Sequence, residues 1–272
     1  TRGAARDLGI RVVASDIGGT LARSDRTISS FAADVIRRLI DQGVHVALLS
    51  GYNLRVAGRY RDMVDRRVVL AAQNGAIIVW GEDVLETNYL SLADARKAIE
   101  LFISHRLSPA AFMGLDDACK IYYQPVSTRY DPAWGLREVE DLGSFLTRDP
   151  VQISAFDLTP KVQAAEAEAR AVFGERCNIV VSIGQEKSWV EVNHPRARKK
   201  IALETILARL GASVDETIYF GDNMNDVETL QAVRFPVAVE NALPEVRRLA
   251  WRVAPPNDSD GVARVLADLF GL

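Results

Sequence analysis

An aspartate followed by two glycines and a threonine is the stretch of this sequence best suited to phosphate chemistry. It reads VVASDIGGTL from Val12 to Leu21, so that Asp16 closes a short apolar run rich in β-branched residues. A carboxylate at the end of a buried strand, next to a glycine loop, can act in two ways. Asp16 could attack a phosphorus atom as a nucleophile, or the glycine turn could hold the phosphates of ATP. The rest of the chain has to distinguish these two chemistries.

Polar residues also stand at the ends of other predicted elements, where an open parallel sheet binds its ligands. These residues are Ser50, Gly51, Lys199, Asp222, Asn225 and Asp226. Together with Asp16 they supply carboxylates for a hard cation, a hydroxyl, an ammonium group and backbone amides. The set predicts a phosphate held beside Mg²⁺, which prefers oxygen ligands.

Strands alternate with helices in the first and last parts of the chain. Apolar runs at 10–14, 44–49 and 68–72 predict buried strands, and helical spacing at 31–40 and 54–64 predicts the helices between them. The pattern returns after residue 199 with a helix at 201–210, a strand at 217–220, a helix from 224, a strand at 236–239 and a helix at 262–270. Such alternation predicts a parallel sheet with right-handed crossovers.

The middle of the chain has a different pattern, in which strand-like runs follow one another through turns. Asn74-Gly75 is a turn signal, and Ser91 with Asp94 predicts a capped helix to about residue 106. The other predicted elements are strands at 84–90, 119–124, 151–158, 179–183 and 189–192 and a helix at 160–173. We therefore predict an α/β fold whose parallel-sheet core, at 1–78 and 192–272, is interrupted by an inserted α+β domain at 79–191.

Composition excludes several classes of function. The 272 residues carry a formal net charge of −3, which argues against a nucleic-acid-binding surface. No apolar run is long enough to span a bilayer, and the opening TRGAARDLG, without an apolar segment behind its arginines, predicts a tail rather than a secretory signal. Cys119 and Cys177 have no metal-like spacing, which favours a reducing, cytoplasmic setting. We expect a monomer or homodimer whose partner is a small phosphorylated metabolite.

Four short motifs carry a resemblance that covers nearly the whole chain. The first motif, DxDGTL, resembles Asp16-Ile17-Gly18-Gly19-Thr20-Leu21, and a second motif resembles Leu49-Ser50-Gly51. Lys199 resembles the lysine of a third motif, KGxAL. The fourth motif, GDxxND, is matched by GDNMND at 221–226. The set is similar to the haloacid dehalogenase (HAD) superfamily, specifically the Cof-like phosphatases. The resemblance implies a Rossmann-like HAD core with a large inserted α/β cap of the C2 type.

The resemblance also implies roles for individual residues. Asp16 would be the nucleophile of an aspartyl-phosphate mechanism, assisted by Lys199, or by Lys200 if the register is shifted by one. The Mg²⁺ ligands would be Asp16, the Gly18 carbonyl, Asp222 and Asp226, and the phosphate contacts Ser50, Gly51, Lys199 and Asn225. Substrate choice would fall to the cap and its surroundings, with Tyr52, Asn53, Asn74 and the turn from Gln185 to Ser188, including Lys187, as candidates. Their polarity favours a sugar phosphate.

Gly18 is the position that departs from this pattern. Most phosphatases of the family have a second aspartate there, which protonates the leaving oxygen, and general acid–base catalysis contributes about 10²–10⁴-fold in rate. The glycine is compatible with a slow phosphatase, with a substrate whose leaving group needs no acid, with a phosphometabolite-binding protein, or with an engineered replacement. For the slow phosphatase, Gly18→Asp should raise hydrolysis.

A second protein family carries the same short motif. The sugar kinases of the actin-like fold carry DIGGTxxR as an ATP phosphate loop, and Asp16 to Thr20 with Arg23 match it. That fold also needs a second phosphate loop and a separate catalytic aspartate, and neither is evident in the sequence. The kinase interpretation leaves Lys199 and GDNMND without a role, so we favour the phosphatase.

Overall fold

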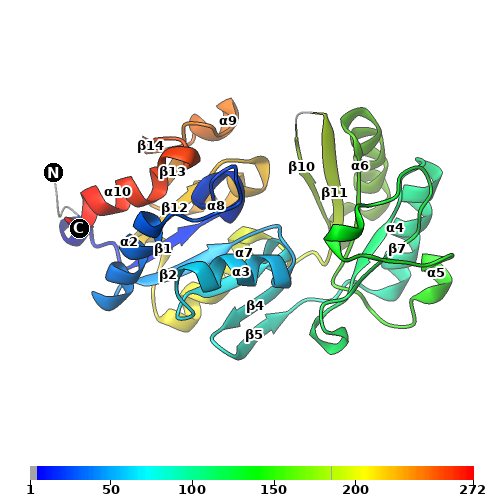
Figure 1. Ribbon diagram of the computed structural model, residues 1–272, viewed down its shortest axis with the longest axis horizontal. Coiled ribbons are helices and arrows are strands. Elements are labelled where there is room, and N and C mark those ends of the chain that lie inside the picture. Colours follow the sequence, from blue (N-terminus) through cyan, green and yellow to red (C-terminus); the bar gives the residue numbers. More distant parts are fainter. Residues whose placement is uncertain (1–4, 185) are drawn as a thin grey trace. The chain divides into compact units, whose positions relative to one another are not determined.

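Two compact units make up the chain. The computed structural model describes residues 5–184 and 186–272, and it divides into a core unit, Thr1–Glu86 with Lys199–Leu272, and an inserted unit, Thr87–Arg198 (Figure 1). The first boundary falls after Glu86 rather than after residue 78, because two further strands extend the core sheet. The second falls after Arg198 rather than after 191, because a strand of the inserted sheet continues to Asn193.

The core unit is built on one twisted sheet. Over the described residues its strand order is β14-β13-β12-β1-β2-β3-β4-β5, with parallel pairing from β14 to β3 and an antiparallel β4. The strands are β1 (Val12–Ser15), β2 (His45–Leu49), β3 (Val69–Ala72), β4 (Ile77–Trp80), β5 (Asp83–Thr87), β12 (Thr217–Gly221), β13 (Phe235–Val239) and β14 (Arg252–Ala254). The predicted α/β fold with a parallel-sheet core is confirmed.

Helices of the core unit pack in two groups. In one group α2 contacts α3 and α10, and in the other α7 contacts α8 and strand β2. Their bounds are α1 (Ala5–Leu8), α2 (Ser30–Asp41), α3 (Leu54–Val64), α7 (Lys199–Leu210), α8 (Val227–Ala232), α9 (Pro244–Arg247) and α10 (Gly261–Phe270). Buried apolar residues at helical spacing, such as Val35, Ile36 and Leu39 on α2, bind these helices to the sheet.

The chain reverses its direction of travel across the sheet at β1. From β1 it proceeds to β2 and β3 on one side, whereas β12, β13 and β14 lie in order on the other side. Strand β1 pairs with β12 so that Ser15 lies opposite Phe220, which brings the residues after both strands to one place. Such a switch point is where open α/β sheets bind ligands.

The inserted unit has its own sheet and its own core. Over the part of the chain that the structure describes, the strand order is β10-β11-β9-β6-β7-β8. Its elements are α4 (Leu92–Ser104), β6 (Ala110–Phe112), β7 (Ile121–Tyr123), β8 (Arg137–Glu138), α5 (Leu142–Phe145), β9 (Gln152–Leu158), α6 (Thr159–Phe173), β10 (Asn178–Ser182) and β11 (Lys187–Asn193). Helices α4 and α6 contact β9, and Phe102, Ile153 and Phe173 are buried between them.

Several elements differ from the sequence-based expectations. The opening segment, expected as a tail, includes helix α1, because the Ala5 carbonyl accepts a hydrogen bond from the Ile10 amide at 3.0 Å. The strand expected at 84–90 ends at Thr87. The short strands β6, β8 and β14 were not predicted, since two or three residues carry no readable alternation. Within residues 5–184 and 186–272, no helix combines the length and apolar character needed to cross a membrane.

Candidate active site

Asp16 occupies the end of β1 at the switch point. Its backbone amide donates to the Phe220 carbonyl at 2.9 Å, and its Oδ1 accepts the Ile17 amide at 2.7 Å. The residues that follow form one wide turn, closed by the Ala22 amide on the Ile17 carbonyl at 2.8 Å. Gly19 has a φ of +74°, a conformation that favours glycine. The DIGGT sequence therefore fixes the backbone on which the Asp16 carboxylate is presented.

Side chains from distant parts of the core unit hold this turn. Asn241 Nδ2 donates to the Gly19 carbonyl at 2.7 Å, and Asn257 Nδ2 donates to the Ala22 carbonyl at 2.9 Å. Thr20 Oγ1 donates to Asp222 Oδ1 at 2.7 Å. Sequence reasoning missed Asn241 and Asn257, which stand in loops without a recognisable motif. Thr20 belongs to the quoted motif, and its side chain joins the turn to the loop after β12.

Lys199 is buried between two carboxylates. Its Nζ lies 2.9 Å from Asp16 Oδ1 and 2.7 Å from Asp226 Oδ1, and its side chain is 0% exposed. Lys199 is the first residue of α7. Because the N-terminal end of a helix disfavours positive charge, the two carboxylates must offset the unfavourable interaction of the ammonium group with the helix. The neighbouring Lys200 is half exposed and pairs with Glu204 at 3.7 Å. The geometry thus favours Lys199 over Lys200 for the predicted role.

Asp226 uses both carboxylate oxygens within the protein. Oδ1 accepts the Lys199 ammonium and the Tyr219 hydroxyl, at 2.7 and 2.5 Å. Oδ2 accepts the backbone amides of Asp222 and Asn223, at 3.0 and 3.1 Å. These bonds orient both Lys199 and the loop that carries Asp222. Asp226 was predicted as a metal ligand; that role stays a prediction, and its hydrogen bonds also give it a positioning role.

Asp16, Asp222 and Asp226 form a cluster in which each offers one oxygen within 4.8 Å of the others. Burial, followed by the charge of Asp226, raises the pKa of Asp222 to about 6. Burial also raises the pKa of Asp16, against the opposing effect of Lys199. Three carboxylates face one ammonium group, so the cluster has an excess of negative charge. A divalent cation would balance it, and the all-oxygen donor set fits Mg²⁺.

Residues from two further loops meet beside this cluster. The Asn225 side-chain amide donates to Asn74 Oδ1 at 3.2 Å, and a Cβ on Gly51 would lie 3.5 Å from that same oxygen. Ser50 is buried, and its Oγ accepts the Tyr52 amide at 3.1 Å. The structure therefore brings together Ser50, Gly51, Asn74 and Asn225, which the sequence assigned to phosphate or substrate.

The predicted specificity residues divide between the two units. Asn53 lies in the core unit, where its Oδ1 caps α3 by accepting the Val56 amide at 3.0 Å. In the inserted unit, Ser188 is buried and its Oγ lies 2.9 Å from Thr159 Oγ1. Lys187 is exposed and its Nζ lies 5.7 Å from the centre of the Phe156 ring. Gln185 lies outside the described residues. Substrate contact through these side chains stays a prediction.

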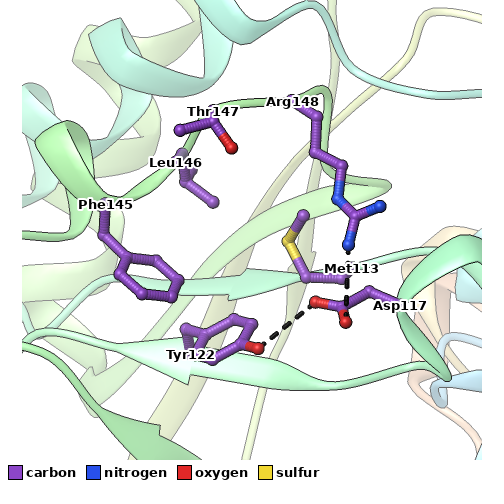
Figure 2. Close-up of a pocket in the computed structure, with 7 residues that line it drawn as sticks. All are labelled: Met113, Asp117, Tyr122, Phe145, Leu146, Thr147 and Arg148. Atoms are coloured by element: carbon purple, nitrogen blue, oxygen red, sulfur yellow. Dashed lines mark hydrogen bonds and ion pairs between the residues drawn. The ribbon is translucent and has the colours of Figure 1, made fainter.

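The inserted unit also contains a pocket of about 210 Å³ between β6, β7 and the segment after α5. Figure 2 shows Asp117 facing Tyr122 and Arg148 in it. Asp117 Oδ1 lies 3.4 Å from Arg148 and 2.7 Å from the Lys120 ammonium. These interactions, of which the hydrogen bond from Lys120 has the largest effect, lower the pKa of Asp117. The carboxylate of the pocket is thus already neutralised by two cations.

The raised pKa of Asp222 predicts a pH dependence of stability in the metal-free protein. A pKa of about 6 in the folded state exceeds the ordinary value, so the folded protein holds this proton more tightly than the unfolded chain. The stabilisation that this tighter proton binding gives to the folded state is therefore complete below about pH 4 and is lost as the pH rises through about 6. Thermal unfolding should show wild type losing stability relative to Asp222→Asn over this range. A difference between the two proteins that does not vary with pH would contradict the assignment.

Comparison with known proteins agrees with the fold and identifies the family. Residues 13–266 match the family of haloacid dehalogenase-like hydrolases, and the chain belongs to that family. It is 24% identical to 5-amino-6-(5-phospho-D-ribitylamino)uracil phosphatase YitU of Bacillus subtilis, over 96% of this chain and 98% of that protein. It is 25% identical to phosphoglycolate phosphatase of Methanothermobacter thermautotrophicus, over 96% and 100%. A haloacid dehalogenase-like hydrolase from Bacteroides thetaiotaomicron has a similar fold, with a TM-score of 0.80, 22% identity and coverage of 96% and 100%.

Family membership decides between the two interpretations of the DIGGT motif. The prediction of a HAD-type enzyme is confirmed, and the sugar-kinase alternative is not supported. Arg23, which matched the kinase motif, forms a two-bond ion pair with Asp260 at 2.7 and 3.0 Å. That arginine therefore serves to join the loop after β1 to the loop before α10.

Proposed function

We propose that this protein is a Mg²⁺-dependent hydrolase that removes phosphate from a small metabolite, a sugar phosphate, through an aspartyl-phosphate. The observation that carries the proposal is the Asp16 carboxylate at the switch point, 2.9 Å from the buried Lys199 ammonium and clustered with Asp222. An oriented carboxylate beside a fixed cation is the arrangement that nucleophilic attack on a phosphorus atom requires.

Each group of the site has a distinct part in this mechanism. Asp16 attacks the phosphorus atom, and water then releases phosphate from the aspartyl-phosphate. Lys199 offsets the negative charge that Asp16 and the phosphoryl group bring together. Ser50, the backbone at Gly51 and Asn225 donate hydrogen bonds to phosphoryl oxygens.

The same site would hold the metal through Asp16, the Gly18 carbonyl and Asp222. When bound, Mg²⁺ would supply positive charge beside the phosphoryl oxygens. Asp226 acts by fixing Lys199 and the backbone of Asp222, as its four hydrogen bonds indicate.

Small phosphomonoesters are the substrate class that we propose. The relatives named above act, by their names, on a phosphoribityl compound and on phosphoglycolate. Tyr52, Asn53 and Asn74 in the core unit and Lys187 and Ser188 in the inserted unit are the proposed substrate contacts. A catalytically weak phosphometabolite-binding protein is the second candidate, and the observation in its favour is Gly18, which has no side chain to move a proton.

A substrate panel tests the function. Purified protein should release inorganic phosphate from sugar phosphates and other small phosphomonoesters with Mg²⁺, lose this activity with a chelator, and regain it when Mg²⁺ is returned. Binding of the same compounds without phosphate release would favour the second candidate. Release that is unaffected by the chelator would contradict the proposed metal site.

A further inference from the structure

Gly18 and Tyr52 fit each other sterically. The Gly18 backbone, at φ −72° and ψ 126°, is one that any residue can adopt, so conformation does not require glycine there. Space is limited instead: a Cβ at this position would lie 2.7 Å from the Tyr52 hydroxyl oxygen and 3.1 Å from Cζ, so Tyr52 would have to shift to admit it. The phenol thus fills the volume that a side chain at position 18 would enter. The absence of an aspartate at position 18 and the presence of Tyr52 beside it therefore belong together.

Two backbone hydrogen bonds and one ring contact position Tyr52, which is 38% exposed. Its amide donates to Ser50 Oγ at 3.1 Å, and its carbonyl accepts the Gln73 amide at 2.9 Å. Its ring stacks on Tyr60 with centroids 5.8 Å apart and planes inclined by 13°. The backbone contacts join Tyr52 to the loops that follow β2 and β3, both of which belong to the active site. The backbone contacts and the stacking on Tyr60 therefore place the ring so that its hydroxyl lies beside Gly18.

The surroundings keep this hydroxyl protonated. Burial, followed by Tyr60 and the charges of Asp16 and Asp222, raises the pKa of Tyr52 to about 12, against the opposing effect of Arg26. The phenol consequently has a hydrogen to donate at neutral pH. Its electrostatic interaction with Asp16 and Asp222 also agrees with a place beside the reacting groups.

We infer that the Tyr52 hydroxyl donates a hydrogen bond to the leaving-group oxygen of the substrate, in the place that a carboxyl group at position 18 would take. The inference rests on the proposed phosphatase function. As the bond from Asp16 to phosphorus forms, the bond from phosphorus to the leaving oxygen breaks and its electron pair stays on that oxygen. Tyr52 gives its proton to this oxygen as the bond breaks, so the leaving group departs as a neutral alcohol and Tyr52 becomes a phenolate. The proton released when water cleaves the aspartyl-phosphate then returns to Tyr52.

Dependence on the leaving group tests the inference, because a donor at that oxygen matters most for poor leaving groups. With Mg²⁺, Tyr52→Phe should lower kcat/KM for the best sugar phosphate of the panel by about 10²-fold, the scale of a lost oxyanion donor. For p-nitrophenyl phosphate, whose leaving group is already stable, the loss should be much smaller. Tyr60→Phe is the matched control: it removes a hydroxyl from the same stacked pair and should change neither value.

The outcomes separate the inference from the function on which it rests. Equal losses on both substrates, or no loss on either, would overturn the role of Tyr52 and leave the phosphatase intact. No Mg²⁺-dependent turnover of either substrate by wild type would overturn both.

A paired substitution gives a second test and revises the expectation for Gly18→Asp. Alone, the aspartate has to displace the Tyr52 ring, so the single variant should not gain activity. In a Tyr52→Ala background the space is open, and adding Gly18→Asp should raise sugar-phosphate turnover by about 10²-fold or more over Tyr52→Ala alone. A double variant no more active than Tyr52→Ala would contradict the shared place of the two groups.

Discussion

Replacing Lys199 with methionine is expected to abolish phosphate release and to cost about 3–5 kcal/mol of the free energy of unfolding at neutral pH. Methionine keeps much of the side-chain volume and removes the ammonium group. Asp16 and Asp226 would then face each other without a cation, with side chains that are 9% and 0% exposed. Denaturant unfolding and a phosphate-release assay measure the two effects.

Lys200→Met is the matched control for that substitution. Lys200 is the next residue of the same helix, and its 3.7 Å pair with Glu204 is exposed on both sides. Exposed ion pairs contribute about 0–1 kcal/mol to stability. The free energy of unfolding and the rate of phosphate release of this variant should therefore be close to those of the wild type. Similar losses in both variants would mean that Lys199 has no special place in the site.

Asp16→Asn is expected to lower kcat by about four orders of magnitude or more, the scale of losing a nucleophile. An amide cannot form the acyl phosphate, although it nearly preserves the shape of the side chain. The free energy of unfolding should change less than in Lys199→Met, since burial already disfavours the charge of Asp16. Asp25→Asn, an exposed carboxylate beyond the same turn, is the control and should retain activity.

Retained turnover in Asp16→Asn would mean that the chemistry takes place elsewhere. If instead neither the wild-type protein nor the variant turns over but both bind phosphate esters, the second candidate function would be favoured.

Elements with strong local signals were predictable from the sequence. Helix α3 spans the predicted 54–64, and the Ser91 hydroxyl caps α4 through the Asp94 amide as expected. Buried strands such as β2 were placed within a residue, because an apolar run between a helix stop and a polar loop leaves few alternatives. The convergence of Asp16 and Asp222 followed from the rule for parallel sheets.

Features that depend on contacts between distant segments were not predictable. The sequence marked Gly18 as a departure and Tyr52 as a candidate for substrate contact, yet only the packing places the phenol against Gly18. Asn241 and Asn257 likewise have no motif, since their role comes from carbonyl groups more than two hundred residues away. Tyr219, whose hydroxyl donates to Asp226, is indistinguishable in the sequence from an ordinary strand residue.

Trapping the covalent intermediate tests the central claim most directly. Wild-type protein is acid-quenched during turnover of the best substrate, digested, and the peptide that contains Asp16 is measured by mass spectrometry. We expect a fraction of that peptide to carry one added phosphoryl group on Asp16, sensitive to hydroxylamine and absent from Asp16→Asn. A protein that turns over while its phosphoryl group appears on another residue would contradict the account.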